Sequence, residues 1–271
     1  MTLVRSRDVI AQQPTRHRNR PCWAILGCLA IVGCSELPPD AVLRIRQSDR
    51  AYRLARFDES ERLAAAVIRD HPAHADAAEA YYLRGLSRIR SGDQNDGRRD
   101  MQTGLKLCDR PQLEALLQLA HLAYGDGRYG PAARLYERSL NCGVDQAHRD
   151  EIWFRYGLSL QRGGAFPAAR TALERVRTQW PAGSSAARAS ANLAWRSDFF
   201  SVQCGAYTSA SGARTAAGQL RRDGIDVYVT TAAVGGDLRH LVCAGHYPDH
   251  AAARRGLNAL RHIQPDAFIV P

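Results

Sequence analysis

The stretch FSVQCGAY at residues 200–207 alternates apolar and polar side chains with a period of two, which is typical of a β-strand with one face in a core. Its closing Gly-x-Tyr pattern recurs at residues 245–247, at the end of a second alternating stretch. Each stretch is followed by an Ala-rich amphipathic segment and a further apolar run. The region 197–271 therefore divides into two similar halves, each built as strand, helix, strand. The expected strands are 200–207, 225–230, 237–245 and 267–270, and the expected helices are 209–222 and 249–263.

This element order, βαββαβ, predicts a ferredoxin-like domain with a four-stranded antiparallel sheet. Both helices then cover one face of the sheet and leave the other face bare. The helix ends support the order, because Asp249 is a suitable N-cap and Asp223-Gly224 closes the preceding helix. The bare face is the expected binding surface.

Residues 200–207 resemble the SPOR (sporulation-related repeat) domain, whose signature is an aromatic residue followed by x-V-Q-x-G-[SA]-[FY]. The match holds at every constrained position. A weaker second signature, R-V-x-V-G-P-[FY], corresponds to residues 241–247, with Leu241 in place of Arg and His246 in place of Pro. Arg239 lies on the same strand face and is a candidate substitute. The resemblance covers residues 197–271 and implies binding to peptidoglycan glycan strands that have lost their stem peptides, which are enriched at division septa.

Strand parity assigns the side chains to the two faces of the sheet. The core face beneath the helices is expected to carry Val202, Cys204, Val242 and Ala244. The candidate glycan-binding residues are Ser201, Gln203, Arg239, Leu241 and Cys243 on the bare face, with Tyr207 at the end of its strand. Gln203 leads them, because an amide donates to and accepts from hydroxyl and N-acetyl groups. A guanidinium pairs with the lactyl carboxylate that peptide removal exposes. The alternatives are that Gln203 is a solvated edge residue and that Tyr207 is a packing residue.

A helical repeat precedes this domain. Its clearest unit reads Trp153-x2-Tyr156-Gly157-x2-Leu160, then Ala169-x3-Leu173, then Pro181, and resembles the tetratricopeptide (TPR) pattern. Weaker copies begin near residues 41, 78 and 113, in register with the clear unit that begins near 150. The region 41–196 therefore predicts a TPR-type α-solenoid, with residues 184–195 as the capping helix that stacked repeats require. The alternative is an irregular Ala-rich bundle.

In such repeats the first helix of each pair lines a concave groove. The shared register places Tyr82, Leu117, Tyr124 and Phe154 in this groove. We expect them to contact an extended or helical segment of a protein partner. The competing interpretation is that these side chains pack against neighbouring repeats.

The N-terminus is interpreted as an export signal. Residues 1–20 are polar and Arg-rich, and the apolar run at 22–33 is too short to span a bilayer as a helix. The run ends in Ile31-Val32-Gly33-Cys34, which resembles a bacterial lipobox. That resemblance implies removal of residues 1–33 as a lipoprotein signal peptide and acylation of Cys34. Ser35 follows instead of Asp, which by analogy implies the periplasmic face of the outer membrane where the host has one. Residues 34–40 are the expected spacer, and the alternative is a plain signal peptide or an unprocessed anchor.

Export also sets the redox context. Cys108, Cys142, Cys204 and Cys243 would remain in a compartment that permits disulfides, and four cysteines allow three pairings. Strand parity argues against a bond between Cys204 and Cys243, because it sets them on opposite faces. The pairing otherwise stays open.

Several function classes are disfavoured by the sequence. The formal net charge is +10, but no basic stripe with interleaved aromatic residues appears, so nucleic acid is not an expected partner. The sole lysine, Lys106, leaves no Walker A motif. Spacing and strand parity argue against a metal site at His240, Cys243, His246 and His250, because parity sets the first two on opposite faces. No cofactor, metal or catalytic site is expected.

Together these features predict a non-catalytic envelope lipoprotein. The SPOR domain would bind denuded septal glycan, and the TPR repeats would hold a protein partner such as a cell-wall hydrolase or a division protein. The alternative is an outer-membrane assembly lipoprotein that acts through its repeats and has a C-terminal domain that does not bind glycan. A wall-cleaving enzyme with carboxylates distant in sequence is a third possibility.

Overall fold

The computed structural model describes residues 36–107, 112–142, 148–234 and 237–270. Residues from Leu37 onward form one compact unit. The helices are α1 (Pro39–Arg53), α2 (Phe57–Asp70), the short 3₁₀ helix η1 (Ala75–Ala77), α3 (Ala78–Arg90), α4 (Gln94–Leu107), α5 (Leu113–Gly125), α6 (Tyr129–Leu140), α7 (Arg149–Arg162), α8 (Phe166–Gln179), α9 (Ala186–Ala194), α10 (Ala210–Arg222) and α11 (His250–Leu260). Within the described ranges, none of them has the length and apolar character needed to cross a membrane. The expected signal peptide and Cys34 lie outside the described residues.

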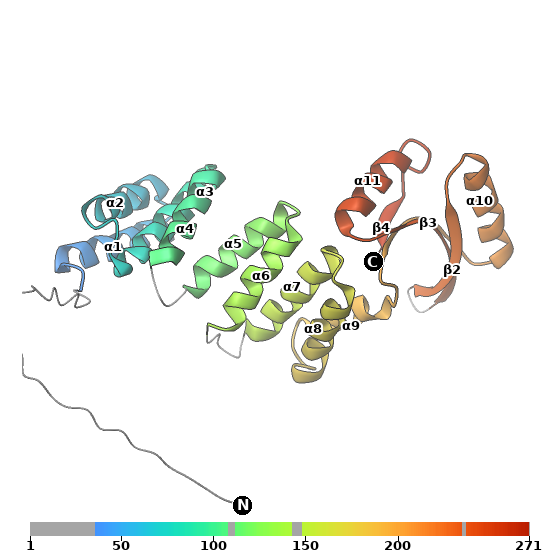
Figure 1. Cartoon of the computed structure of the whole chain (residues 1–271), viewed down its shortest axis with the longest axis horizontal. Helices are drawn as coiled ribbons and strands as arrows, with labels where there is room; N and C mark the ends of the chain where they lie inside the picture. Colours follow the sequence, from blue (N-terminus) through green and yellow to red (C-terminus); the bar gives the residue numbers. More distant parts are fainter. Residues whose placement is uncertain (1–35, 108–111, 143–147, 235–236, 271) are drawn as a thin grey trace, which may run out of the picture. The chain divides into compact units, whose positions relative to one another are not determined.

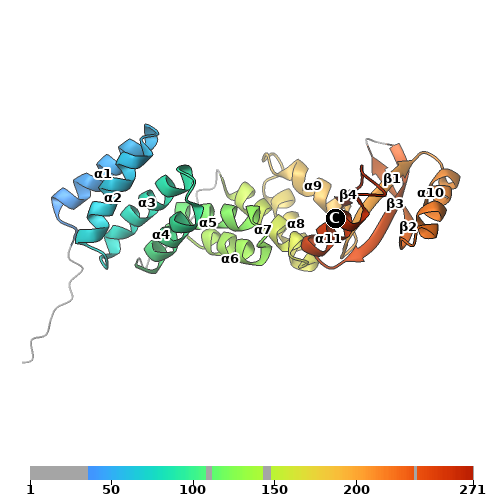
Figure 2. The same ribbon diagram turned by 90° about the horizontal axis from the view of Figure 1, so that it is seen from above.

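Helices α1 to α8 pack as consecutive antiparallel pairs, and each pair packs against the next (Figures 1 and 2). Helix α9 packs against α8 as the expected cap. Close approach within a pair depends on small residues, since a Cβ on Gly157 of α7 would lie 2.9 Å from the Leu173 side chain of α8. The turn between these two helices uses Gly164 in the left-handed region, at a φ of +86°. The predicted helical repeat is confirmed.

The first helix begins earlier than expected. Pro39 opens α1, and Leu37 before it is only 5% exposed, packed with Ala41 and Ile45. Proline suits the first turn of a helix, where its missing N–H has no helical partner. The segment 37–40 therefore packs with the first repeat, and α1 begins inside the span 34–40 that was expected to be a spacer.

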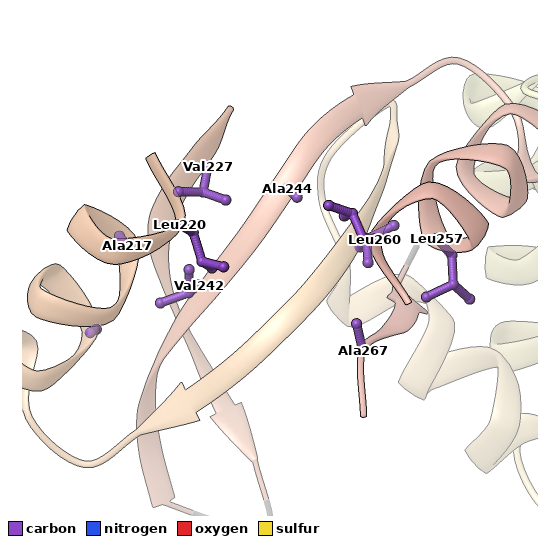
Figure 3. Packing of buried hydrophobic residues seen from close by; sticks show 10 residues of the cluster. Ala217, Leu220, Val227, Val242, Ala244, Leu257, Leu260 and Ala267 are labelled. Atoms are coloured by element: carbon purple, nitrogen blue, oxygen red, sulfur yellow. The ribbon is translucent and has the colours of Figure 1, made fainter. Parts of the chain in front are cut away.

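The C-terminal region folds as predicted into a four-stranded antiparallel sheet. Its strands are β1 (Phe200–Tyr207), β2 (Val227–Val234), β3 (Asp237–Tyr247) and β4 (Phe268–Val270), in the order β2-β3-β1-β4. Helices α10 and α11 cover one face. Figure 3 shows Leu220 of α10 beside Val227 and Val242, while Leu257 and Leu260 of α11 lie toward the Ala244 and Ala267 end.

The core face agrees with strand parity. Val202 and Val242 are fully buried, and Ala244 is 1% exposed, within the cluster beneath the two helices. Cys204 is half-buried and packs against the same cluster. The predicted ferredoxin-like arrangement, with one face of the sheet left free by both helices, is confirmed.

Strand β1 departs from regular alternation at Cys204. Gln203 pairs with Cys243, but Gly205 pairs with Val242, so two residue steps on β1 correspond to one on β3. Such a bulge shifts every later side chain of the strand to the opposite face. Tyr207 is therefore on the helix-covered face.

Candidate functional site

A cleft of about 580 Å³ lies over the face of the sheet that α10 and α11 leave free. This volume is within the range of small-molecule sites, roughly 300–1,000 Å³. One side is formed by strand residues and the other by the end of α9 and the segment that follows it. The lining residues are Ala191, Ala194, Trp195, Arg196, Ser197, Gln203, Tyr228, Thr230, Thr231, Ala232, Leu241 and Val270.

Gln203 and Leu241 are the sequence-predicted residues that line this cleft. Gln203 is half-buried, and its amide makes no hydrogen bond to any other described residue. Both its donor and its acceptor are therefore available to a ligand. Leu241 is only 3% exposed and supplies an apolar part of the floor.

Ser201 and Cys243 are on the predicted face but are fully buried. The Ser201 hydroxyl donates to the Gly245 carbonyl at 2.8 Å and lies 2.6 Å from the Tyr228 hydroxyl. Burial, and then the nearby Cys204, raise the pKa of the Cys243 thiol to about 11, although the Tyr228 hydroxyl acts in the opposite direction. These two side chains therefore support Tyr228 from beneath and do not reach the cleft.

Arg239 and Tyr207 lie elsewhere. Arg239 is opposite Ala232, which lines the cleft, but its guanidinium pairs with Asp237 at 3.1 Å. Tyr207 packs against the core beneath the helices, and its ring lies where a Cβ on Gly205 would be. The prediction that Tyr207 shares the glycan face is wrong in placement, because the bulge at Cys204 reverses the strand parity after Gln203.

An aromatic group on the same face was not predicted. The Tyr228 ring stacks on the His246 ring with 4.7 Å between centroids, and Phe199 meets His246 edge-on at 4.3 Å. Tyr228 also lines the cleft. Its position could have been inferred only from the strand register, which sets Tyr228 directly opposite Cys243.

The residues at which the sequence argued against a metal site are separated in the structure. His246 belongs to the aromatic group on the free face, whereas the His250 ring contacts Tyr129 and Phe200. Among the described residues, no cluster of three or more His, Cys, Asp or Glu side chains is placed to hold a metal ion.

The four predicted groove residues have different surroundings. Tyr82 is half-buried, and burial and then the Glu114 carboxylate raise its pKa to about 12. Leu117 is half-buried against the α5–α6–α7 cluster, and Tyr124 is half-buried with the Arg162 guanidinium 5.0 Å from its ring centroid.

Phe154 is buried and is not exposed in a groove. It is 2% exposed, it packs against Leu173 and Ala189, and the Arg188 guanidinium covers its ring at 4.1 Å. The prediction that Phe154 contacts a partner is wrong, because α9 packs over this end of the repeat region and covers the ring. The acidic Glu151 holds Arg188 in place at 2.9 Å.

Of the cysteines with an open pairing, three lie in the described residues. Cys142, Cys204 and Cys243 are all free thiols. Cys108 lies outside the described residues.

Known proteins show two kinds of similarity. Residues 197–271 match the family model of the SPOR domain. No curated protein matches the chain. Among solved structures, pilF of Pseudomonas aeruginosa has 15% identity and a TM-score of 0.46, and the match covers 56% of this chain and 66% of that one. YrrB, described as a TPR protein with an unusual peptide-binding site, has 16% identity and a TM-score of 0.47 over 54% of this chain and 72% of its own. MamA has 17% identity and a TM-score of 0.46 over 55% and 78%.

The family match covers the sheet, α10, α11 and the part of the cleft that the strands form. The paired helices α1 to α8 and the terminal α9 account for the rest of the described chain. The protein therefore contains a SPOR domain at residues 197–271, preceded by a TPR-like helical repeat region.

Proposed function

We propose that this protein is a non-catalytic envelope lipoprotein that binds denuded peptidoglycan glycan through the cleft on its SPOR domain. A SPOR domain implies peptidoglycan binding in the cell envelope, and a TPR-like region implies protein interaction. The observation that carries the proposal is the free Gln203 amide in a cleft that also contains the Tyr228 ring.

The chemistry of the cleft fits a sugar chain. Pyranose rings present C–H groups on their faces and hydroxyl or N-acetyl groups at their edges. An aromatic ring such as Tyr228 offers an apolar surface to the former, and the Gln203 amide offers a donor and an acceptor to the latter. Leu241 and the threonine Thr230 extend this mixture of apolar and hydroxyl-bearing surface.

The repeats have the role of holding a protein partner in division or wall remodelling. Tyr82, Leu117 and Tyr124 remain half-buried candidates for that contact, with the lipid on Cys34 as the membrane attachment. A partner such as a wall hydrolase would thereby be concentrated where glycan has lost its peptides.

The test is co-sedimentation of the full-length chain in detergent with sacculi before and after amidase treatment. We expect binding that increases after treatment and weakens about thirtyfold in Gln203→Ala, since two lost hydrogen bonds of about 1 kcal/mol each total about 2 kcal/mol. The matched control is Gln219→Ala, an exposed glutamine on α10 that should bind as wild type. Equal and negligible pelleting in every arm would refute glycan binding and favour the assembly alternative. Release of soluble muropeptides by the chain alone would refute the non-catalytic part.

A further inference from the structure

The segment between α9 and β1 is held in a defined conformation. Arg170 of α8 donates to the Arg196 carbonyl at 3.3 Å and forms an ion pair with Asp198. The indole N–H of Trp195 donates to the Phe199 carbonyl at 3.3 Å. Residues 195–199 are therefore held to α8 by Arg170, and the Trp195–Phe199 hydrogen bond links the two ends of the segment.

This segment forms the second side of the cleft. Trp195 and Arg196 line it together with the strand residues Gln203 and Tyr228, and two alanines of α9 line it as well. Trp195 is half-buried and Arg196 is exposed. Within the part of the chain that the structure describes, the Arg196 guanidinium has no ion-pair or hydrogen-bond partner, since only its carbonyl is engaged.

We propose that Trp195 and Arg196 are glycan-binding residues, so that the site is built jointly by the end of the repeat region and the SPOR domain. The inference rests on the proposed function and adds residues before the SPOR domain, which the family match begins at 197. Trp195 supplies a second aromatic surface in the cleft that Tyr228 also lines. Arg196 supplies the cation for the lactyl carboxylate of a muramic acid residue without its peptide.

The arrangement is pre-organised, because Arg170 and the Phe199 carbonyl hold both residues before any ligand arrives. Ordering a free linker on binding would cost part of the affinity, and that cost is reduced here. Arg170 is thus a positioning residue, and it does not itself line the cleft.

The test measures binding of soluble peptide-free glycan oligosaccharides to the full-length chain. Calorimetry gives the affinity, and the decrease in acrylamide quenching of tryptophan fluorescence reports protection by the ligand. We expect Trp195→Ala to bind at least about fivefold more weakly, as truncated aromatic residues at the centre of a site do. Trp195→Phe should keep most of the affinity and lose the ligand-dependent protection. The matched control Trp180→Ala, a half-buried tryptophan outside the cleft, should keep both.

A charge test is independent of the tryptophan. Arg196→Ala should weaken binding and make it less sensitive to salt, because the lost contact is between charges. Unchanged affinity in both Trp195→Ala and Arg196→Ala, with a clear loss in Gln203→Ala, would overturn the joint site and leave the proposed function standing. Tighter binding in Trp195→Ala would overturn it as well, since the segment would then cover the sheet and not contribute to the site. Absence of binding by the wild type would refute both proposals.

Discussion

Replacing Ser201 distinguishes a residue that supports the cleft from one that contacts the ligand. The Ser201 hydroxyl is fully buried, donates to the Gly245 carbonyl at 2.8 Å and lies 2.6 Å from the Tyr228 hydroxyl. Because Ser201 uses its proton toward Gly245, Tyr228 donates to Ser201. Ser201→Ala therefore removes two hydrogen bonds, and Tyr228→Phe removes one.

The expected costs follow from this count. At about 1 kcal/mol for each net hydrogen bond, Ser201→Ala should lower the free energy of unfolding by about 2 kcal/mol and Tyr228→Phe by about 1 kcal/mol. The double variant should lose about 2 kcal/mol, since both changes remove the same bond. The coupling between the sites is then about 1 kcal/mol, well above the additivity error of ~0.3–0.5 kcal/mol. Urea unfolding followed by circular dichroism gives all four values.

Glycan binding supplies the second readout. Tyr228→Phe keeps the ring and should bind within about threefold of wild type, because the stacking surface remains. If Ser201 acts only through Tyr228, Ser201→Ala should change affinity no further once Tyr228 is already Phe. Additive losses of stability, or a separate loss of affinity from Ser201→Ala in the Tyr228→Phe background, would refute this account and restore Ser201 as a ligand contact.

Three further predictions concern stability and reactivity. Gly157→Ala should lower the free energy of unfolding in urea by ~1–3 kcal/mol, because the added Cβ would lie 2.9 Å from the Leu173 side chain of α8. Gly218→Ala should raise it by ~0.5–1 kcal/mol, because no atom lies within 4 Å of the added Cβ and alanine favours a helix. Equal effects of the two substitutions would contradict the close packing of α7 against α8. Burial and then two arginines lower the pKa of His250, so its contribution is present above its unfolded pKa of about 6.5 and is lost as the pH falls through the lower folded value. The urea midpoint should therefore fall between about pH 6.5 and pH 5, and fall less in His250→Phe; parallel curves would count against this. Iodoacetamide at about pH 8 should label Cys142 in the folded chain long before Cys243, which is fully buried with a pKa raised to about 11, and mass spectrometry showing the reverse order would disprove it.

Strand alternation predicted most of the sheet from the sequence. The core positions Val202 and Val242 and the cleft residue Gln203 follow from a period of two, because each lies on the expected side of a regular strand. The same rule failed for Tyr207, since one bulge residue changes the side of everything after it. Neither the position of a bulge nor the pairing of Tyr228 with Cys243 is encoded in alternation alone.

The remaining differences arise from contacts between distant parts of the chain. Register alone places Phe154 toward a groove, but α9 brings Arg188 over its ring and closes that surface. The conformation of residues 195–199 depends on Arg170, which contacts Asp198, 28 positions later in the sequence. Local periodicity does not predict an ion pair between distant residues, so the sequence did not predict that residues 195–197 line the cleft.

Helix α9 takes part in both the repeat packing and the cleft. Arg188 covers Phe154 and pairs with Glu151 at 2.9 Å, which fixes the helix on α7. Three and six residues after Arg188, Ala191 and Ala194 line the cleft beside the sheet. Ala191 and Ala194 follow Arg188 by about one and two helical turns, so the helix contacts the cleft nearer its C-terminus than the residue that holds it on α7. A ligand that contacts the end of α9 would therefore act on a helix whose position is set by the repeats. If a partner in the repeats shifts α9, the effect on glycan affinity and the effect of glycan on partner affinity must be equal, because binding free energies around a closed cycle sum to zero.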